Sequence, residues 1–598
     1  MLGKRKHSAS SGATDNVSSK SRCNSVSNAH MGPVAPSAFH GVPRYVQYTS
    51  PVPALAPQDV ARRSAALPLN LVAHIISYLA DIGDIARVTR TSRLLYYMTL
   101  PRLYEHVNLH SYATMRYING RPEGFGSGSP FMMALDGLAT KAHAALVRHL
   151  RIWGCWNELG IEDFAKGRVP DNSMMLNIIL RAATDKMTRL ESFCWELDCK
   201  PLKTLYQGLA THSNLTAFTL RFPSTRVPRP AVLIPPMVNL RVFKALDIDP
   251  MCYPDDISML MLGSKKLEDV RLHFSPRMRA EAESIMNLNM FFGRCHKANY
   301  KMKVKHFGLH NFFGPNVLGM EHVFDIDTCE SVTFLDTFGN NNPKTIFIDE
   351  TWKGVPMDLF TKFKRVRINE LAPQHLLIMR NSKVSVEKYY IVNERRGKTG
   401  FTPPDNSEPT PNTDLSDDTD SWIDPSLANL KDDFLATVTK VHGEGIKHLL
   451  LSDQWPLTRD DVHLIARDCP QLEQLGLAVN TSTHDWLVLL MPFLKNLRAL
   501  RVLPNEHLAE HFRHVSHEER MNHLGITLAN DPRAKFELLG MGDVVYRVGR
   551  MMEDVQQDGT IVRRREVTMR GLEAAKGYAI WDLDHLDINV DPVAPFSP

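Results

Sequence analysis

Short stretches of this sequence carry residue types that are used in catalysis, but each lacks part of the pattern that its chemistry requires. The glycine-rich stretch 124–128 does not lie between a predicted strand and a predicted helix, and no G-x-x-x-x-G-K-[ST] sequence occurs, so we expect a flexible loop rather than a phosphate cradle. His517 is followed by two glutamates but lacks the second histidine of a zinc-protease helix. The sequence also contains no G-x-S-x-G nucleophile elbow. We therefore predict that the chain is not an enzyme and uses no cofactor.

Residue types that bind metals are present without the spacing of a metal site. Asp582, Asp584 and Asp587 lack the glycine and the closing glutamate of a calcium-binding loop. The 8 cysteines form no CxxC pair, and the 25 histidines show no ligand spacing. We predict no metal site, and we expect the cysteines to be reduced thiols in the core of an intracellular protein.

The composition favours a mostly globular chain with a disordered start. Of the 598 residues 43% are hydrophobic and 23% charged, and a net charge of +4 gives no argument for nucleic acid or an anionic membrane as partner. Residues 1–60 are predicted to be a disordered tail, whose Lys4-Arg5-Lys6 is either a nuclear import signal or a solvated basic segment. No secretory signal and no run of about 18 apolar residues occurs, so we expect the nucleus, the cytoplasm or both.

In residues 67–109 apolar side chains recur at helical spacing. Leu67-Pro68-Leu69 suits the first turn of a helix, where proline is tolerated. Asp84 is predicted to cap a second helix. A unit of about 40 residues cannot bury so much apolar surface by itself, so the excess implies a partner or docking on the rest of the chain. The apolar residues that continue the pattern are Leu71, Val72, Ile75, Ile76, Leu79, Ile85, Val88 and Leu94.

This stretch resembles the F-box of fungal F-box proteins. The L-P-x-x-L…I-x-x-Y-L opening, the D-I-x-x-V centre, the S-R-L and the closing P-x-L-Y-x-x-V-x-L follow in the order of that family. The tryptophan common near the end of an F-box is absent, and Tyr96 and Tyr97 are the candidates for its place. The resemblance implies a helical module over 61–112 that binds the Skp adaptor subunit. The residues that it implies for this contact are Leu67, Pro68, Leu71, Val72, Ile75, Ile76, Leu79, Ile85, Val88 and Leu94.

An internal repeat of the form apolar-x-x-apolar-x-apolar runs from residue 146 to about residue 541. Successive units begin 25, 25 and 27 residues apart in one part of the chain, and 26 and 25 apart in another. This period lies within the roughly 20–29 residues of leucine-rich repeats. The units are Val147/Leu150/Ile152, Leu190/Phe193/Trp195, Leu215/Phe218/Leu220, the degraded Leu240/Phe243, Leu267/Val270/Leu272, Val304/Phe307/Leu309, the shortened Val366/Ile368, Ile446/Leu449/Leu451, Leu472/Leu475/Leu477, Leu497/Leu500/Val502 and the weakest, Phe536/Leu539/Met541.

The repeat predicts an α/β fold class, with a strand, a turn and a returning helix in each unit. Neither element buries its apolar face alone, but stacked units do. The pattern resembles the irregular leucine-rich-repeat domains of F-box proteins; the alternative is an ordinary α/β domain with amphipathic strands. We expect an irregular leucine-rich-repeat solenoid over 140–395 and 426–541, interrupted by a disordered acidic insertion at 396–425. A C-terminal hairpin cap and tail, with Asp558-Gly559 as its turn, is expected over 542–598.

Two functions from different classes fit these parts. By resemblance, the chain is the substrate-recognition adaptor of a Skp–cullin–F-box ubiquitin ligase: the F-box binds the Skp subunit and through it a cullin, and the repeat domain binds an unknown protein substrate. Catalysis then works by proximity, because the ligase raises the effective concentration of a charged conjugating enzyme at a bound lysine. The alternative is a non-catalytic scaffold outside the ubiquitin pathway, in which the helical module covers the open end of the solenoid.

Overall fold

The computed structural model describes residues 67–79, 81–124, 128–223, 232–249, 255–275, 289–311, 323–335, 362–368, 371, 373–392, 425–480, 487, 490–503, 515–529, 535–542, 544–555 and 561–581. The chain divides into two compact units, residues 1–72 and residues 73–598. Some predicted features lie outside the described residues. They are the tail 1–60, the acidic insertion up to residue 424, the Asp558-Gly559 turn, and Asp582, Asp584 and Asp587.

Three helices open the described part: α2 (Leu69–Ser77), α3 (Ile82–Val88) and α4 (Arg93–Glu105), which together we call the helical module. The cap of α3 is Asp81 rather than the predicted Asp84, and its carboxylate accepts a hydrogen bond from the Asp84 amide at 2.8 Å. The helix starts one turn earlier than predicted, so Asp84 lies in its first turn, where a negative charge still suits the helix dipole. Ser92 caps α4 by accepting a hydrogen bond from the Leu95 amide at 3.1 Å.

The strands that follow form one long, mostly parallel sheet, which is 17-stranded over the described residues. Neighbours from β1 through β4 to β17 pair in parallel, while β18 and β19 add an antiparallel pair at the end. The strands are β1 (His106–Ser111), β4 (His149–Gly154), β5 (Ser192–Leu197), β6 (Ala217–Arg221), β7 (Val242–Ile248), β8 (Asp269–Phe274), β9 (His306–His310), β10 (Ser331–Leu335), β11 (Arg365–Ile368), β12 (Lys388–Ile391), β13 (His448–Leu450), β14 (Pro456–Leu457), β15 (Gln474–Val479), β16 (Ala499–Val502), β17 (Leu538–Met541), β18 (Val544–Val555) and β19 (Ile561–Arg570). A separate short hairpin joins β2 (Tyr117–Ile118) to β3 (Arg121–Pro122).

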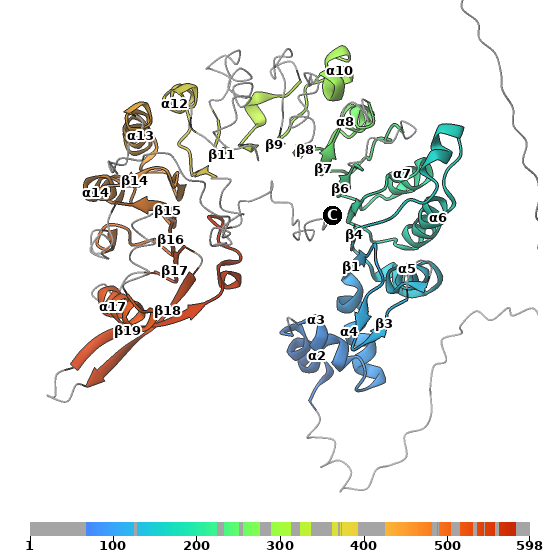
Figure 1. Cartoon of the computed structure of the whole chain (residues 1–598), viewed down its shortest axis with the longest axis horizontal. Coiled ribbons are helices and arrows are strands. Elements are labelled where there is room, and N and C mark those ends of the chain that lie inside the picture. The colour runs from blue at the N-terminus through green and yellow to red at the C-terminus, as the bar shows by residue number, and fades with distance from the viewer. Residues whose placement is uncertain are drawn as a thin grey trace, which may run out of the picture. The chain divides into compact units, whose positions relative to one another are not determined.

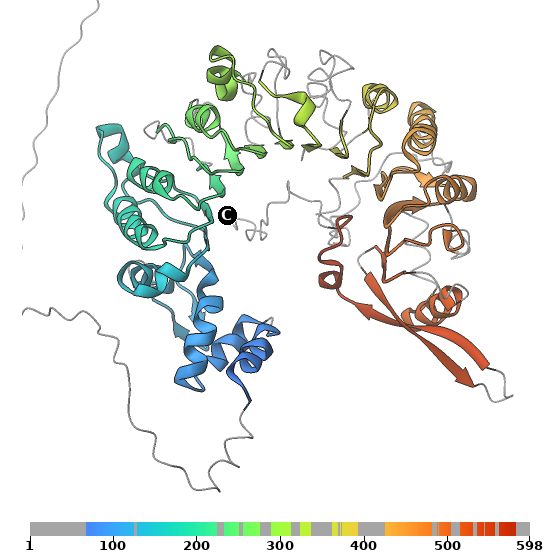
Figure 2. The same cartoon turned by 180° about the vertical axis from the view of Figure 1, so that it is seen from behind.

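Helices connect many of the parallel strands, and they all cover the same face of the sheet (Figure 1; Figure 2 shows it from behind). The α-helices are α5 (Pro130–Thr140), α6 (Asp171–Lys186), α7 (Lys203–Thr211), α8 (Ser258–Gly263), α10 (Asn289–Lys297), α12 (Pro373–Arg380), α13 (Pro425–Thr437), α14 (Arg459–Asp468) and α17 (His517–Ala529). Short helical turns are η2 (Ala142–Leu146), η3 (Ile161–Lys166), η5 (Ile326–Thr328), η9 (Val438–His442) and η10 (Leu572–Ala575). Parallel strands need such crossover connections, so this layering follows from the strand direction. None of the described helices is long and apolar enough to cross a lipid bilayer.

The core lies between the sheet and these helices, because alternate strand residues point toward the helices. In the register of β4 to β7, Leu150, Phe193, Phe218 and Phe243 stand side by side, each at most 1% exposed. Neighbouring phenylalanine rings meet in tilted contacts, with centroids 6.1 and 5.8 Å apart. Similar columns continue through the later strands, so the core extends along the whole sheet.

The opposite side carries none of the described α-helices, and we call it the helix-free face. It is partly covered by residues 571–581, the segment after β19, which includes the short turn η10. Ala575 and Ile580 of this segment are buried against apolar residues of the sheet, among them Tyr390, Leu450 and Leu538. The Ile580 carbonyl accepts a hydrogen bond from Arg501 on β16 at 2.7 Å. The end of the described chain is therefore built into the sheet.

All eleven apolar units that the sequence analysis identified coincide with strands, from β4 to β9, at β11 and β13, and from β15 to β17. Strands β1, β10 and β12 were missed, although their residues follow the same spacing. The missed units are Tyr104/Val107/Leu109, Cys329/Val332/Phe334 and Val386/Tyr389/Ile391. The sequence analysis assigned residues 106–111 to the helical module, whereas in the structure they form β1, which pairs in parallel with β4. The antiparallel pair predicted after residue 541 is present as β18 and β19.

Candidate functional site

The helical module has a small core of its own. Ile76, Ile85 and Leu100 are 6%, 3% and 8% exposed. Arg102 on α4 donates hydrogen bonds to the carbonyls of Ile76 and Leu79, at 2.5 and 2.7 Å. The Ile76 carbonyl belongs to the last turn of α2, whose acceptors have no partner within the helix, and the Leu79 carbonyl lies two residues beyond its end. Arg102 therefore ties the end of α2 to α4.

Around this core the module leaves many large apolar side chains in solvent. Residues four apart follow one another on a helix, and Leu71 and Ile75 on α2 are 44% and 55% exposed. Leu94, near the start of α4, is 49% exposed. The other large apolar residues exposed in this stretch are Leu67, Leu69, Tyr78, Ile82 and Tyr97. Isolated exposed apolar residues are common on proteins, but so many within one short stretch are typical of a contact surface.

The structure places the ten residues predicted to contact the Skp subunit in three groups. Ile76 and Ile85 are buried in the module and unavailable to a partner. Val72, Leu79 and Val88 are half-buried, so they have only part of their surface to offer. The exposed group comprises Leu67, Pro68, Leu71, Ile75 and Leu94. Sequence spacing alone does not separate these groups, because helical periodicity identifies an apolar face without showing what covers it.

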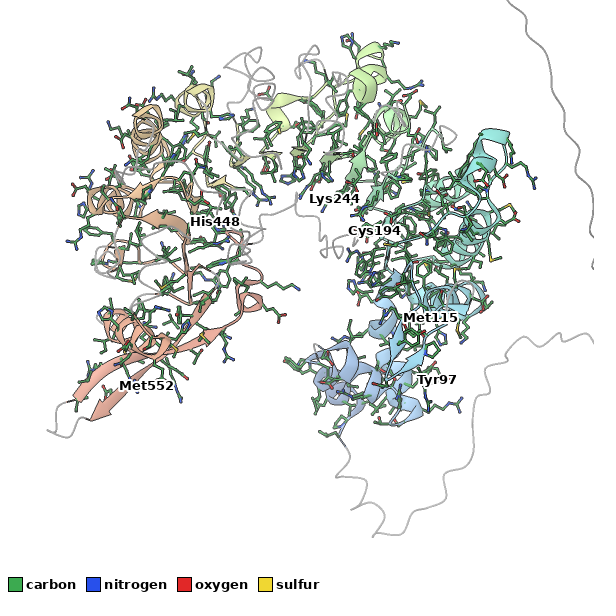
Figure 3. The ribbon with its side chains drawn as sticks, viewed as in Figure 1. Tyr97, Met115, Cys194, Lys244, His448 and Met552 are labelled. Atoms are coloured by element: carbon green, nitrogen blue, oxygen red, sulfur yellow. The ribbon has the colours of Figure 1, made fainter. Side chains whose placement is uncertain are left out.

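Tyr96 and Tyr97, the candidates for the place of the missing tryptophan, have different surroundings. The Tyr96 hydroxyl lies 3.0 Å from the His143 ring, and this ring also stacks on Tyr104 with centroids 5.2 Å apart. Tyr97 is 60% exposed, and Figure 3 shows its position on the module. Tyr96 thus joins α4 to η2, while Tyr97 remains available for contact.

The helix-free face carries the polar residues of the strands. Their register aligns two polar rows, one through the first residue of most strands and one through the third. Cys194, Lys244 and His448, labelled in Figure 3, belong to these rows on β5, β7 and β13. The α-helices cover the other face of the sheet (Figure 1). A ligand can therefore reach the sheet from this polar face.

Between β4 and β8 the charged residues of this face form ion pairs. The Arg151 guanidinium lies 2.7 Å from the Glu196 carboxylate, and the side chain of Glu196 is only 5% exposed. Arg221 lies 3.2 Å from Asp247. Arg271 and Asp269 are two residues apart on β8 and 2.7 Å from each other. These pairs offset the cost of holding charge in a partly desolvated place.

Burial keeps the described core cysteines unreactive. It raises the pKa of Cys295 to about 11, and the pKa values of Cys329 and Cys469 to about 12. Burial, together with the charge of Glu196, raises the pKa of Cys194 as well. These thiols stay protonated at neutral pH, whereas nucleophiles and metal ligands are thiolates.

Glu105, His106 and His149, at the edge of β1 and β4, are the one described group with the composition of a metal site. Their ligand atoms lie within 4.8 Å of one another, and the two imidazole rings stack with centroids 4.4 Å apart. Burial, then His106, lowers the pKa of His149, so this ring is neutral at pH 7 and able to bind a metal. The Arg148 guanidinium, however, lies 3.2 Å from Glu105 and competes with a cation for its carboxylate. The absence of a metal site stays a prediction.

The apolar positions of each unit predict the strands, but the polar positions between them carry the side chains of the helix-free face. In the unit apolar-x-x-apolar-x-apolar, the residue between the last two apolar positions faces the helix-free side, as Arg151 and Arg271 do. Successive strand residues point to opposite faces of the sheet. This alternation was therefore the signal in the sequence that would have assigned these polar side chains to the helix-free face.

In comparisons with known proteins, no family model and no curated protein matches this chain.

Proposed function

We propose that this chain is the substrate-recognition adaptor of a Skp–cullin–F-box ubiquitin ligase, whose helical module binds the Skp subunit. The proposal rests on one observation made within residues 73–598: the module buries a small core yet leaves Ile75 and Leu94 exposed. The ordered F-box-like motifs of residues 67–109 lie in the same stretch. A surface of this kind is stable in water mainly when a partner covers it.

We also propose that the strand–helix units form an irregular leucine-rich-repeat solenoid that binds a protein substrate. The support is the spacing of about 25 residues and the parallel register of successive strands. The ligase would act by proximity, holding a substrate lysine near the conjugating enzyme, so this chain need supply no catalytic group.

The expected affinity comes from the exposed apolar side chains. Each one, fully buried against a partner, contributes on the order of 1.5–3 kcal/mol. The net affinity is smaller than their sum, because association costs about 4–15 kcal/mol of translational and rotational freedom and a further amount for ordering the side chains. Removing two of them should therefore reduce binding by several orders of magnitude.

The test is the double variant Leu71→Asp/Ile75→Asp, which places charge on one side of α2 and leaves the buried Ile76 intact. We expect the wild type to co-purify with the Skp subunit and the variant to lose it, with both chains equally folded by circular dichroism. The matched control is Ile178→Asp on α6, because Ile178 is also exposed, at 61%. Equal recovery of the Skp subunit by the wild type and the double variant would refute the proposal for this surface.

The scaffold alternative also has an observation in its favour. Helix α4 contacts η2 through Tyr96 and Tyr104, and it leads directly into β1, so the module does cover part of the start of the sheet. A pull-down of the full chain from its source cell, probed for the Skp and cullin subunits, separates the two functions. The absence of both subunits at native expression would favour the scaffold.

A further inference from the structure

A cavity of about 260 Å³ opens on the helix-free face where β8 to β12 lie side by side. The segment after β19 also lines the cavity, through Gly577 and Ala579. The strands contribute Arg271, His306, Phe307, Gly308, Ser331, Thr333, Arg365, Arg367 and Tyr390. The cavity lies outside the helical module, and it shares one residue, Arg271, with the ion pairs of β4 to β8.

The register explains why the sheet is hollow at this point. Arg271, Gly308, Thr333 and Arg367 occupy equivalent positions on four successive strands. Neighbouring strands are about 4.8 Å apart, so Gly308 leaves a gap in the row between Arg271 and Thr333. Arg271 borders this gap on one side and Thr333 on the other, and Arg367 follows one strand further along the row.

The charge of the cavity is strongly one-sided. Three guanidinium groups line it, and its described lining contains no carboxylate. The Arg271 guanidinium donates hydrogen bonds of 2.8 and 2.7 Å to the Asp269 carboxylate, which lies outside that lining. Arg365 forms no ion pair with a carboxylate of the described residues, and neither does Lys388, its neighbour in the register on β12. Arg367 is only 2% exposed. Cations gathered in this way repel each other, and their desolvation costs free energy that an anion would offset.

The positive charges around the cavity also affect the pKa values of two neighbouring groups, Lys388 and His448. Burial, followed by the charge of Arg365, lowers the pKa of Lys388. Burial and the nearby cations Lys388, Arg365 and Lys447 lower the pKa of His448 to about 3. Both shifts have the sign expected of a region with excess positive potential.

We propose that this cavity binds the phosphoryl group of a phosphate monoester, held by the guanidinium groups of Arg271, Arg365 and Arg367 and by the Thr333 hydroxyl. Arginine suits the group because its planar fork donates two parallel hydrogen bonds to phosphate oxygens. A phosphate monoester carries about −1.5 to −2 charges at pH 7 and three acceptor oxygens, which matches several cations and a hydroxyl better than a carboxylate does. This inference does not depend on the adaptor function.

The size of the cavity limits the ligand. Sites for whole small molecules usually have about 300–1,000 Å³, so about 260 Å³ suits a phosphoryl group and the atoms next to it. A phosphorylated serine or threonine of another protein and a small free phosphate ester present the same group.

The test is a calorimetric titration of the purified full chain with phenyl phosphate at fixed ionic strength. We expect saturable binding at one site, and binding at least tenfold weaker for phenyl sulfate, which has the same shape but a single charge. Equal affinity for the two esters, or no saturable binding of phenyl phosphate, overturns the proposal. A phosphoserine peptide compared with free phosphoserine then identifies the source, because tighter binding of the peptide indicates a protein ligand and equal binding a small ester.

Arg365→Gln tests the assigned residues. We expect at least tenfold weaker binding of phenyl phosphate, since a charge-assisted bidentate contact is lost. Its matched control is Arg498→Gln, because Arg498 is an arginine of the same sheet that pairs with Glu537 at 3.0 Å, outside the cavity. Thr333→Val, which is nearly isosteric, should weaken binding about threefold or more. Binding as tight as in the wild type by either cavity variant contradicts the assignment.

A thermal melt provides an independent measurement. Phenyl phosphate should raise the Tm of the wild type, because a ligand that binds only the folded state stabilises it, and it should not raise the Tm of Arg365→Gln. Without ligand, Arg365→Gln should melt no lower than the wild type, since it removes a repelled cation. An equal ligand-induced shift in both proteins would place the phosphate elsewhere.

Discussion

Two stretches of the helix-free face differ in whether their charged side chains form ion pairs. On β4 to β8, arginines and carboxylates alternate closely enough to pair, as Arg151 and Glu196 do at 2.7 Å. On β9 to β13, Arg365 and Lys388 lie side by side without a described carboxylate in ion-pair range. Same-face positions in a sheet are only a few ångströms apart, so the first stretch gains free energy from its charges and the second loses it. Charged side chains at equivalent strand positions thus stabilise the fold on β4 to β8. On β9 to β13 they provide positive charge that a bound anion can neutralise.

The largest expected effect comes from a buried ion pair in the segments that follow β5 and β7, two strands of the first stretch. Lys200, after β5, pairs with Asp256, before α8, and their side chains are 5% and 1% exposed. Lys200→Met leaves a buried carboxylate without its cation, so we expect the free energy of unfolding to fall by about 3–5 kcal/mol. Urea unfolding followed by circular dichroism measures it, with the exposed neighbour Lys203→Met as control. A loss below 1 kcal/mol would mean that the pair contributes little.

Acid should destabilise the second stretch through His448. Its pKa in the folded chain is about 3, below the ordinary value of 6.5, because burial and neighbouring cations disfavour the charged ring. Between these two pH values the unfolded chain binds the proton and the folded chain does not, so stability is present above pH 6.5 and falls as the pH decreases. The loss is at most about 1.4 kcal/mol per pH unit. Unfolding midpoints at pH 7 and pH 5 should differ less in His448→Gln, and an unchanged difference would argue against this origin.

The ion pair of Glu196 and Arg151 should make a moderate contribution to the free energy of unfolding. Glu196→Gln keeps the shape but removes the charge that faces Arg151, whose side chain is 21% exposed. We expect the free energy of unfolding to fall by about 1–2 kcal/mol. Glu191→Gln is the control, because Glu191 pairs with Arg148 at a more exposed place and should cost less. If both variants lose the same amount, burial does not distinguish the two pairs.

The smallest effect has the opposite sign. Lys388→Met removes a cation whose pKa is lowered by burial and then by Arg365. Relief of a like-charge contact across two strands should raise the free energy of unfolding by about 0.2–1 kcal/mol. Paired denaturation curves with the exposed Lys383→Met as control measure this gain. A clear destabilisation would show that Lys388 has a favourable role in the folded chain, and the contrast between the two stretches would then fail.

Much of the sheet could be predicted from sequence because its period is set by large apolar residues. Leu190, Leu215 and Leu240 mark successive units directly. The strands at 331–335 and 388–391 were missed because cysteine and tyrosine stand where leucine was expected, as at Cys329 and Tyr389. The spacing of apolar residues shows which side of a strand is buried, whichever apolar residue stands there. The spacing alone would therefore have predicted these two strands, although the residue types are unusual.

The candidate surfaces were less predictable, because exposure depends on what else packs nearby. Ile75 and Ile76 are adjacent and chemically equal, yet one is 55% exposed and the other 6%. The phosphate cavity depends on residues that no local pattern brings together: Arg271 and Arg365 lie far apart in sequence, and Gly308 supplies the gap between neighbouring strands. Only the parallel register brings these strands into successive positions along one face of the sheet.

The packing of residues 571–581 against the sheet has a consequence for biosynthesis. Gly577 and Ala579 complete a site whose other walls are translated long before them. A ribosome-bound chain can assemble the earlier strands while this site still lacks one wall, so the site becomes complete only after residues 571–581 have been translated. A protein fused directly after Trp581 would sit next to that wall, so a reporter of this site is better attached elsewhere in the chain.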